Sequence, residues 1–353
     1  MPPTFPRSEF PIVAPQMLSF ACGHCGRLVF FENSLCLHCR TPQGFVPERL
    51  ELVALEGAAA DELHRCANFE LIGCNWMVGA ERRLCRSCEL TRTRPGDSDV
   101  IGMAELAHAE NAKRRVIMQL LDLGLPGVAA GQLSFDLLSS EAKPVQTGHD
   151  DGVITIDLAE SDDARREQRR TELGEPYRTV LGHLRHELGH YFQPLLVSGD
   201  GDWDASRDLF GDERADYTEA LERHYESGPP ADWRTRFVSA YATMHPWEDW
   251  AETFAHYLHI RDTLQTAADY GVVVSGPRAV ADKRPLASAP LPDAAGRGFA
   301  ELLREWLPLT YALNAVNRSM GRDDLYPFTL AQPVIDKLTF VHEHVLAAGA
   351  RST

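Results

Sequence analysis

Apolar residues recur at the spacing of an amphipathic α-helix over residues 99–123, and the pattern stops at Gly124-Leu125-Pro126. This stop is typical of a helix end, because Gly frees the backbone and Pro cannot continue a helix. Two later segments predict strands, residues 133–138 and residues 153–158, and in the second of these apolar and polar side chains alternate. The sequence Gly-His-Asp-Asp-Gly at 148–152 predicts a turn that leads into the second strand.

The rest of the chain predicts mainly helices. A charged helix is expected from about residue 162 to just before Pro176, followed by a longer helix at 177–196. Further helices are expected at 232–242, 247–263, 297–316 and 332–348, with a long loop rich in Pro, Ala and Gly at 272–295. We therefore expect an α+β fold in which a mostly helical domain follows a small β-rich module.

Composition narrows the class of protein. The chain has 353 residues, of which 44% are hydrophobic, so it can bury a sizeable core and form about two domains. Its formal net charge is −16, which argues against nucleic acid as a partner because neutralising phosphates requires positive charge. The sequence contains no apolar run of about 18 residues, so it predicts no membrane span. The Pro-rich N-terminus also lacks the apolar segment of a secretory signal. We expect a cytoplasmic protein without membrane contact.

All eight cysteines lie between positions 22 and 88. The first four are Cys22, Cys25, Cys36 and Cys39, which form two CxxC pairs separated by ten residues. A CxxC knuckle aims two sulfurs at one ion, and a short hairpin between knuckles completes a tetrahedron. In a reducing compartment this spacing predicts a zinc ribbon with one structural Zn²⁺, rather than disulfides. Surface thiols or a redox CxxC are the alternatives.

The second four cysteines are Cys66, Cys74, Cys85 and Cys88, in which one knuckle is opened to seven intervening residues. We expect a second structural Zn²⁺ there, because a loop-rich segment of this size gains folding energy from metal. Nearby arginines form a basic cluster, namely Arg82, Arg83, Arg86, Arg92 and Arg94. The cluster is either a solvated face or a contact for an acidic partner protein or nucleic acid. The run after Arg94 resembles a linker, so we place a tandem zinc-ribbon region at residues 1–95 and a second domain at 96–353.

The helix expected at 177–196 contains His186-Glu187-Leu-Gly-His190, the HExxH pattern. Residues four apart share a helix face, so His186 and His190 can bind one Zn²⁺. Glu187 is placed to act as general base toward water that the metal activates. The apolar residues of the helix form one stripe, and we expect the two histidines on the opposite side, lining a cleft; the stripe is Leu181, Leu184, Leu188, Tyr191 and Leu195.

A catalytic zinc site needs a third protein ligand and leaves one position for water. Glu248 and Glu252 are four apart on the next aromatic-rich helical segment, so one can bind zinc while the other accepts the spare N–H of a ligating histidine. Glu213 and Asp216 are the rival third ligands, since they follow His190 by 23 and 26 residues. For these acids we favour an architectural role, such as pairing with Arg185 or Arg214.

HExxH followed downstream by ExxxE resembles the gluzincin metallopeptidases. The resemblance implies that Glu248 is the zinc ligand and that Glu252 supports a ligating histidine. The run Glu248-Asp-Trp-Ala-Glu252-Thr-Phe is also similar to the corresponding helix of anthrax lethal factor, where a tyrosine seven residues before the ligand Glu lines the active site. Tyr241 stands at that spacing, which implies a role in stabilising the oxyanion. The rival residues for this role are His224, Tyr225, His245 and Tyr257.

More broadly, the chain resembles a bacterial family of zinc-binding metallopeptidases that carry an N-terminal zinc ribbon. The resemblance covers nearly the whole chain and rests on short stretches at residues 65–68, 74–76, 175–178, 186–190, 210–217 and 245–259. It implies a zincin-like fold. In zincins the strand upstream of the active helix is a sheet edge that binds extended peptide, which implies the same use of residues 153–158.

Two classes of function follow. The first is a zinc-dependent peptidase that acts on a peptide or protein substrate, with one catalytic and two structural zinc ions, and Glu187 favours it because a purely structural site needs no base. The second is a binding or scaffold protein, in which the ribbons recognise a partner protein or nucleic acid and the zincin domain is structural or self-restricted.

Overall fold

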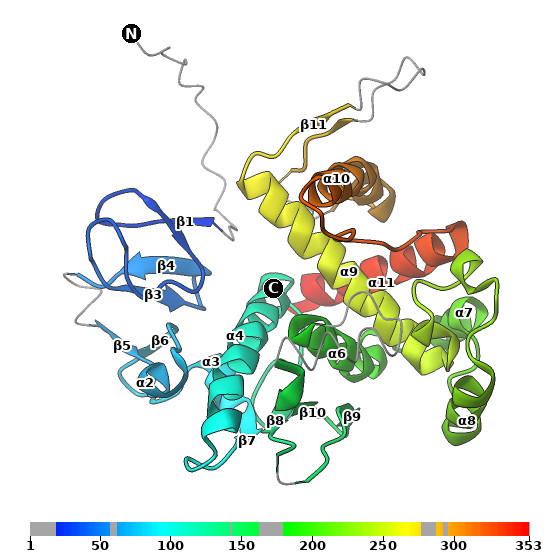
Figure 1. Cartoon of the computed structure of the whole chain (residues 1–353), viewed down its shortest axis with the longest axis horizontal. Helices are drawn as coiled ribbons and strands as arrows, with labels where there is room; N and C mark the ends of the chain where they lie inside the picture. Colours follow the sequence, from blue (N-terminus) through cyan, green and yellow to red (C-terminus); the bar gives the residue numbers. More distant parts are fainter. Residues whose placement is uncertain are drawn as a thin grey trace.

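The computed structural model describes residues 19–56, 62–141, 143–161, 179–276, 287–291 and 296–352. The charged helix expected from about residue 162 and the stretch 175–178 lie outside these residues. Within them, a small β-rich module is followed by a mostly helical part, so the α+β prediction is confirmed. The N-terminal module lies at one end of the molecule, and helices α7 and α8 lie at the other (Figure 1).

The N-terminal module consists of three short antiparallel hairpins and two single-turn helices. Its elements are β1 (Ser19–Ala21), β2 (Leu28–Phe30), β3 (Gln43–Val46), β4 (Glu51–Ala54), β5 (Leu63–Arg65), α2 (Phe69–Ile72), β6 (Met77–Gly79) and α3 (Arg86–Glu89). Aromatic packing joins the hairpins: the ring of Phe45 lies edge-to-face with that of Phe31 at 4.9 Å and tilted against that of Trp76 at 5.1 Å. This small aromatic cluster is the apolar core of the module.

A four-stranded sheet, ordered β7-β8-β10-β9, follows the module. Its strands are β7 (Thr91–Thr93), β8 (Ser134–Leu138), β9 (Gly148–Asp150) and β10 (Val153–Asp157), with helix α4 (Val100–Asp122) between β7 and β8. The sequence predicts α4, β8 and β10 closely, whereas β7 was not expected and 148–150, expected as part of a turn, forms β9. The prediction that 153–158 forms a sheet edge is wrong, because β10 lies between β8 and β9, and the edge strands are β7 and β9.

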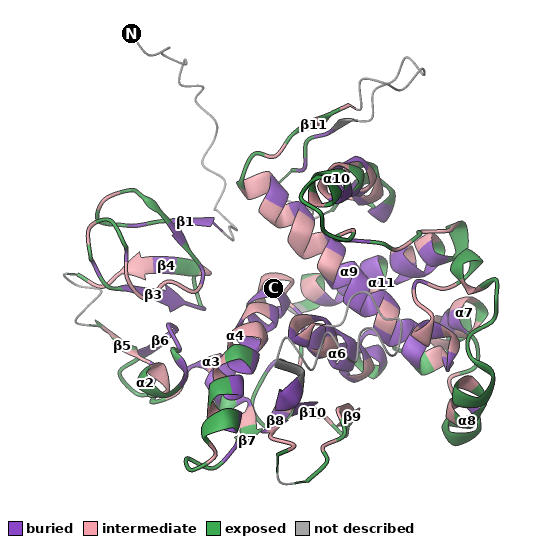
Figure 2. Cartoon of the chain, in the orientation of Figure 1, coloured by how far each residue is buried: buried purple, intermediate pink, exposed green. Residues whose placement is uncertain are grey.

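Helices form the rest of the described chain. They are α6 (Val180–Leu196), α7 (Asp200–Phe210), α8 (Tyr217–Ser227), α9 (Pro246–Asp269), α10 (Phe299–Ser319) and α11 (Gln332–Ser352), with the short strands β11 (Val274–Ser275) and β12 (Ala287–Ser288) inside the expected long loop. Sequence reasoning missed α7 and α8. Both are rich in polar residues, and α8 buries only Ala220, so no apolar stripe marks it (Figure 2).

The prediction of a helix at residues 232–242 is wrong. The segment contains only the 3₁₀ turns Trp233–Thr235 and Tyr241–Thr243. Hydroxyl groups of short side chains satisfy its backbone instead: Ser239 Oγ accepts from the N–H of Ala242 at 3.1 Å, and Thr243 Oγ1 donates to the carbonyl of Ala240 at 2.7 Å. Such local bonds compete with helix formation.

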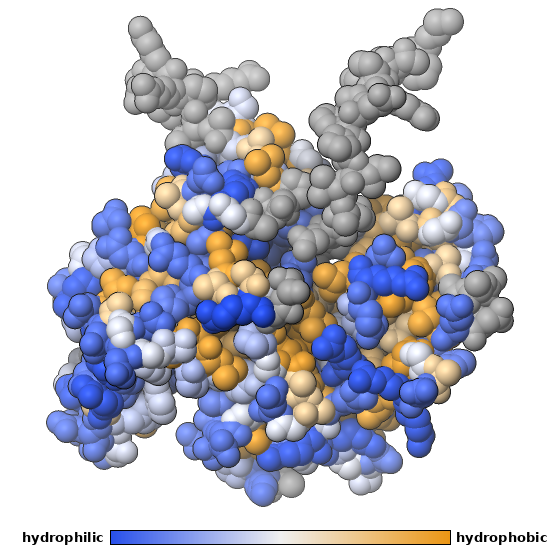
Figure 3. All heavy atoms as spheres, turned by 180° about the vertical axis from the view of Figure 1, so that it is seen from behind, coloured by the Kyte–Doolittle hydropathy of each residue, from blue (hydrophilic) through white to orange (hydrophobic). Residues whose placement is uncertain are grey.

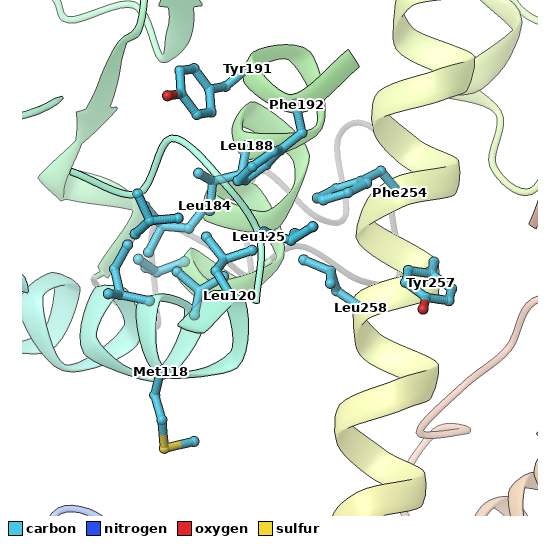
Figure 4. Close-up of a cluster of buried hydrophobic side chains, with 14 of the residues drawn as sticks. Met118, Leu120, Leu125, Leu184, Leu188, Tyr191, Phe192, Phe254, Tyr257 and Leu258 are labelled. Carbon is cyan, nitrogen blue, oxygen red and sulfur yellow. The ribbon is translucent and has the colours of Figure 1, made fainter. Parts of the chain in front are cut away.

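Helices α6 and α9 cross in close contact at the centre of the core. Leu184, Leu188 and Phe192 of α6 face Phe254 and Leu258 of α9 (Figure 4). The approach is closest at Gly189, where an added Cβ would lie 2.8 Å from Cα of Ala251 and 3.1 Å from its carbonyl oxygen. Trp250 fixes the crossing, because its Nε1–H donates to the carbonyl of Gly189 at 2.9 Å.

The surface differs from this interior. On the side of the molecule turned away in Figure 1, apolar groups reach the surface in patches between hydrophilic ones (Figure 3). Within the described part of the chain, no helix combines the length and the apolar character needed to cross a membrane.

We expect Gly189→Ala to lower the free energy of unfolding. Forcing a methyl group against the backbone of Ala251 costs about 1–3 kcal/mol, which exceeds the gain of about 1 kcal/mol that alanine brings to a helix. Urea denaturation followed by circular dichroism measures the change. Gly201→Ala in α7 is the matched control, because nothing lies within 4 Å of its added Cβ. Equal stability of the two variants would contradict the close packing of α6 on α9.

Candidate metal centres

The first four cysteines come together in the N-terminal module, Cys22 and Cys25 from the turn between β1 and β2, and Cys36 and Cys39 from the connection between β2 and β3. Sγ of Cys22 lies 3.7 Å from Sγ of Cys39, and Sγ of Cys25 lies 3.7 Å from Sγ of Cys36. A disulfide would bring two sulfurs to about 2.05 Å. Four thiolates around a zinc ion at about 2.3 Å stand about 3.8 Å apart, which matches the observed spacing.

The second four cysteines form a similar but more deeply buried group. Sγ of Cys74 lies 3.6 Å from that of Cys85 and 3.7 Å from that of Cys88. Backbone N–H groups point at the sulfurs, from Cys85 to Sγ of Cys66 and from Cys88 to Sγ of Cys85, both at 3.4 Å. These donors stabilise thiolates, so the opened first knuckle still delivers four sulfurs to one point.

A third group joins helices α6 and α9. His186 and His190 project from α6 and Glu248 from the first turn of α9, with one ligand atom from each within 4.8 Å of the others. Nε2 of His186 lies 2.9 Å from Oε2 of Glu248 and 3.2 Å from Nε2 of His190. Ligand atoms of a tetrahedral zinc site with bonds of about 2.0–2.1 Å stand about 3.3 Å apart, so the spacing suits that ion.

Glu252, one turn after Glu248, determines the state of His186. Burial alone would raise the pKa of Glu252, but the hydrogen bond from His186 lowers it to about 2. Its carboxylate therefore accepts a hydrogen bond from the Nδ1–H of His186, at 2.7 Å. In a neutral His186 the other nitrogen, Nε2, then has a lone pair and no proton, which is the form that ligates metals.

The atoms that converge here therefore need a positive charge. Oε2 of Glu248 is buried and has no hydrogen-bond partner within the described chain. Burial lowers the pKa of His186, but Glu248 and Glu252 outweigh it and raise the pKa well above the usual range. Either a proton or a metal cation can supply the missing charge. The donor set of two imidazoles and one carboxylate fits zinc.

Glu187 lies on α6 beside His186, and only 7% of its surface is exposed. Burial raises the pKa of its carboxyl group, although His186 and His190 oppose the shift. The two histidines were expected to line a cleft, and they lie on the side of α6 that faces Glu248 and Glu252 of α9. Helix α6 is buried on most sides, and His186 is only 9% exposed between α6 and α9.

Two tyrosines border the same group. The ring of Tyr241, in the 3₁₀ turn before α9, has its centroid 5.9 Å from that of His186. Burial raises its pKa, so the phenol stays a hydrogen-bond donor. Sequence reasoning missed Tyr217, whose hydroxyl donates to Oε1 of Glu248 at 2.9 Å. Its only sequence signal was membership of the acidic stretch at 210–217.

The rival acids lie elsewhere. Both carboxylate oxygens of Glu213 accept from Arg207, at 2.7 and 3.1 Å, and Asp216 caps α8 by accepting from the N–H of Glu219 at 2.9 Å. Of the two arginines expected as partners for this acidic stretch, Arg214 binds Asp212, at 2.7 and 2.9 Å. Arg185 instead binds Asp262, at 2.5 Å. The structure therefore brings Glu248, and neither rival, to the two histidines.

Comparison with known proteins identifies the family of the chain. The family described as "Putative zinc-binding metallo-peptidase" matches residues 103–344, and a zinc-ribbon domain matches residues 19–99. The chain belongs to this metallopeptidase family. It is 50% identical to uncharacterized proteins from two strains of Mycobacterium tuberculosis and one of Mycobacterium bovis, over 92% of this chain and 94% of each relative. No solved structure shows a significant match.

We expect the cysteines of the native, reduced protein to be protected from thiol reagents. All eight are free of disulfides, and metal-bound thiolates in buried positions react slowly. Titration with Ellman's reagent should detect few thiols until a strong chelator is added, and zinc release should accompany the reaction. Denatured protein provides the total of eight. Rapid reaction of all thiols before chelation would contradict bound metal.

Proposed function

We propose that this protein is a zinc-dependent peptidase of the gluzincin type. The observation that carries the proposal is the convergence of His186, His190 and Glu248 on one point, with the buried carboxylate of Glu187 beside them. A purely structural site would need four protein ligands and no base. The three converging groups leave one tetrahedral position for water or substrate.

In this proposal His186, His190 and Glu248 hold the ion, and Glu252 fixes the tautomer of His186. When bound, zinc supplies Lewis acidity, which polarises a carbonyl group and makes water more acidic. Glu187 removes the proton from the attacking water and returns it to the nitrogen of the leaving amine. Its burial favours this shuttling, because a raised pKa brings a carboxyl group closer to neutral pH. Tyr241 donates a hydrogen bond to the oxyanion.

The substrate class is an extended peptide or protein segment. Strand β9 forms the outer edge of the sheet and pairs only with β10 among the described strands. His149 of β9 has its ring centroid 6.0 Å from that of Tyr191, the residue that follows His190 on α6. A peptide that adds to β9 as a further strand would therefore run beside the metal group.

The two four-cysteine groups are proposed as structural zinc sites, for a total of about three zinc ions per chain. In each group all four zinc positions are taken by sulfur, which leaves no position for substrate. Eight reduced thiols also favour the cytoplasm as the compartment.

Glu187→Gln should abolish cleavage of a peptide library while zinc content stays unchanged. Loss of a general base costs about 10²–10⁴-fold in rate, and Gln keeps the shape of the side chain. Elemental analysis and mass spectrometry of the library measure both quantities. Glu301→Gln, an exposed substitution on α10, is the control. Cleavage by Glu187→Gln at the wild-type rate would remove the proposed mechanism.

Glu248→Ala should lose one zinc ion per chain, whereas Glu213→Ala should keep the full complement. Among the described residues, Glu248 is the acid whose carboxylate groups with both ligand nitrogens within 4.8 Å, while Glu213 is held by Arg207. Inductively coupled plasma mass spectrometry gives the zinc count, and Glu248→Gln tests the ligand role with less loss of packing. Zinc loss in Glu213→Ala, with retention in both Glu248 variants, would transfer the third ligand to Glu213.

A further inference from the structure

A pocket of about 350 Å³ opens on the N-terminal module, away from the histidine site. We call it the ribbon pocket. It lies where three parts of the module meet: the end of β3 with the turn that follows, the β5–β6 hairpin, and the start of α3. A volume of this size is at the lower end of the range for specific ligand sites.

The floor of the ribbon pocket is apolar. It is formed by Val46, Leu63, Met77 and Val78, of which Val46, Met77 and Val78 are at most 5% exposed. A buried floor keeps its shape when a ligand arrives, so an apolar side chain can bind there without reordering the module. Met77 in particular adapts to irregular apolar shapes.

The border of the ribbon pocket carries positive charge. Arg49, Arg82 and Arg86 line it, against one acidic residue, Glu48. Within the described chain neither Arg49 nor Arg86 has an ion-pair partner, and Arg82 lies 3.7 Å from Glu89 in an exposed contact worth little. The three arginines make the border of this pocket locally positive, although the whole chain has a net charge of −16.

We infer that the ribbon pocket binds an acidic protein segment, inserting one apolar side chain while neighbouring carboxylates pair with Arg49, Arg82 and Arg86. Arginine forms bidentate bonds with carboxylates and is enriched in protein interfaces. The apolar floor gives the segment an anchor, and the arginines set its charge preference.

A nucleic acid fits the ribbon pocket less well. Base stacking needs aromatic side chains, and none of the lining residues is aromatic. Glu48 at the border and the acidic remainder of the chain repel a polyphosphate. The inference is independent of peptidase activity, because binding is measured directly and does not involve the histidine site.

The test uses the full-length protein and a fluorescein-labelled peptide, Glu-Asp-Leu-Phe-Asp-Glu, blocked at both ends. Fluorescence anisotropy should show saturable binding that weakens with added salt. A peptide with Lys in place of each acid, and one with Ser in place of Leu-Phe, should each bind at least about tenfold more weakly. The Glu187→Gln variant should bind the acidic peptide as tightly as wild type.

Charge variants locate the binding to the ribbon pocket. Arg49→Glu/Arg86→Glu should weaken binding at least about tenfold, and Glu48→Lys should strengthen it. Arg304→Glu, an exposed reversal on α10, is the matched control and should change nothing. Circular dichroism and zinc content verify that the variants fold. Undetectable peptide binding, equal affinity in the double variant, or binding of an oligothymidine in place of the peptide would each overturn the inference.

Discussion

The close crossing of α6 and α9 is the constraint on which the site depends. Each helix presents a pair of groups four residues apart, and such pairs meet only when the two helix axes approach closely. Gly189 permits that approach because it has no side chain facing Ala251, and the bond from Trp250 to its carbonyl sets the rotation. Glycine at this position lowers the stability of the helix by about 1 kcal/mol, and the close helix packing that it allows offsets this loss.

This crossing also buries charge, and the structure compensates for it pair by pair. Arg185 of α6 binds Asp262 of α9 at 2.5 Å, and Lys337 of α11 binds Asp249 at 2.6 Å. The carboxylates of buried Glu248 and partly buried Glu252 differ, because the groups that face them are His186 and His190 rather than fixed cations. Removing an acid from water without a full counter-charge is costly. A site arranged in this way is therefore stabilised by whatever cation enters it.

The sequence could predict those features that follow from helical spacing. HExxH and the Glu248–Glu252 pair are each local, and a helix period places their members on one face without knowledge of the fold. Tyr217, by contrast, reaches Glu248 across 31 residues of chain, and only the packing of α8 decides that contact. The same limit explains the edge of the sheet. Strand β10 has the clearer alternating pattern, yet the three residues of β9 complete the sheet through backbone bonds that leave little trace in side-chain type.

The N-terminal module and the helical part share one framework, although the cysteines and the histidines lie far apart in sequence. Strand β7 directly follows α3, which contains Cys88, and pairs with β8 of the main sheet. Helix α4 continues the connection, because its buried Lys113 donates a hydrogen bond to the hydroxyl of Thr91 in β7. Gln119 of the same helix donates to the carbonyl of Leu258 in α9 at 2.7 Å. It also accepts from Arg185, the neighbour of His186, at 3.1 Å. Free energy that metal contributes to the cysteine groups therefore stabilises β7 and α4, and through them the two helices that hold the histidine site.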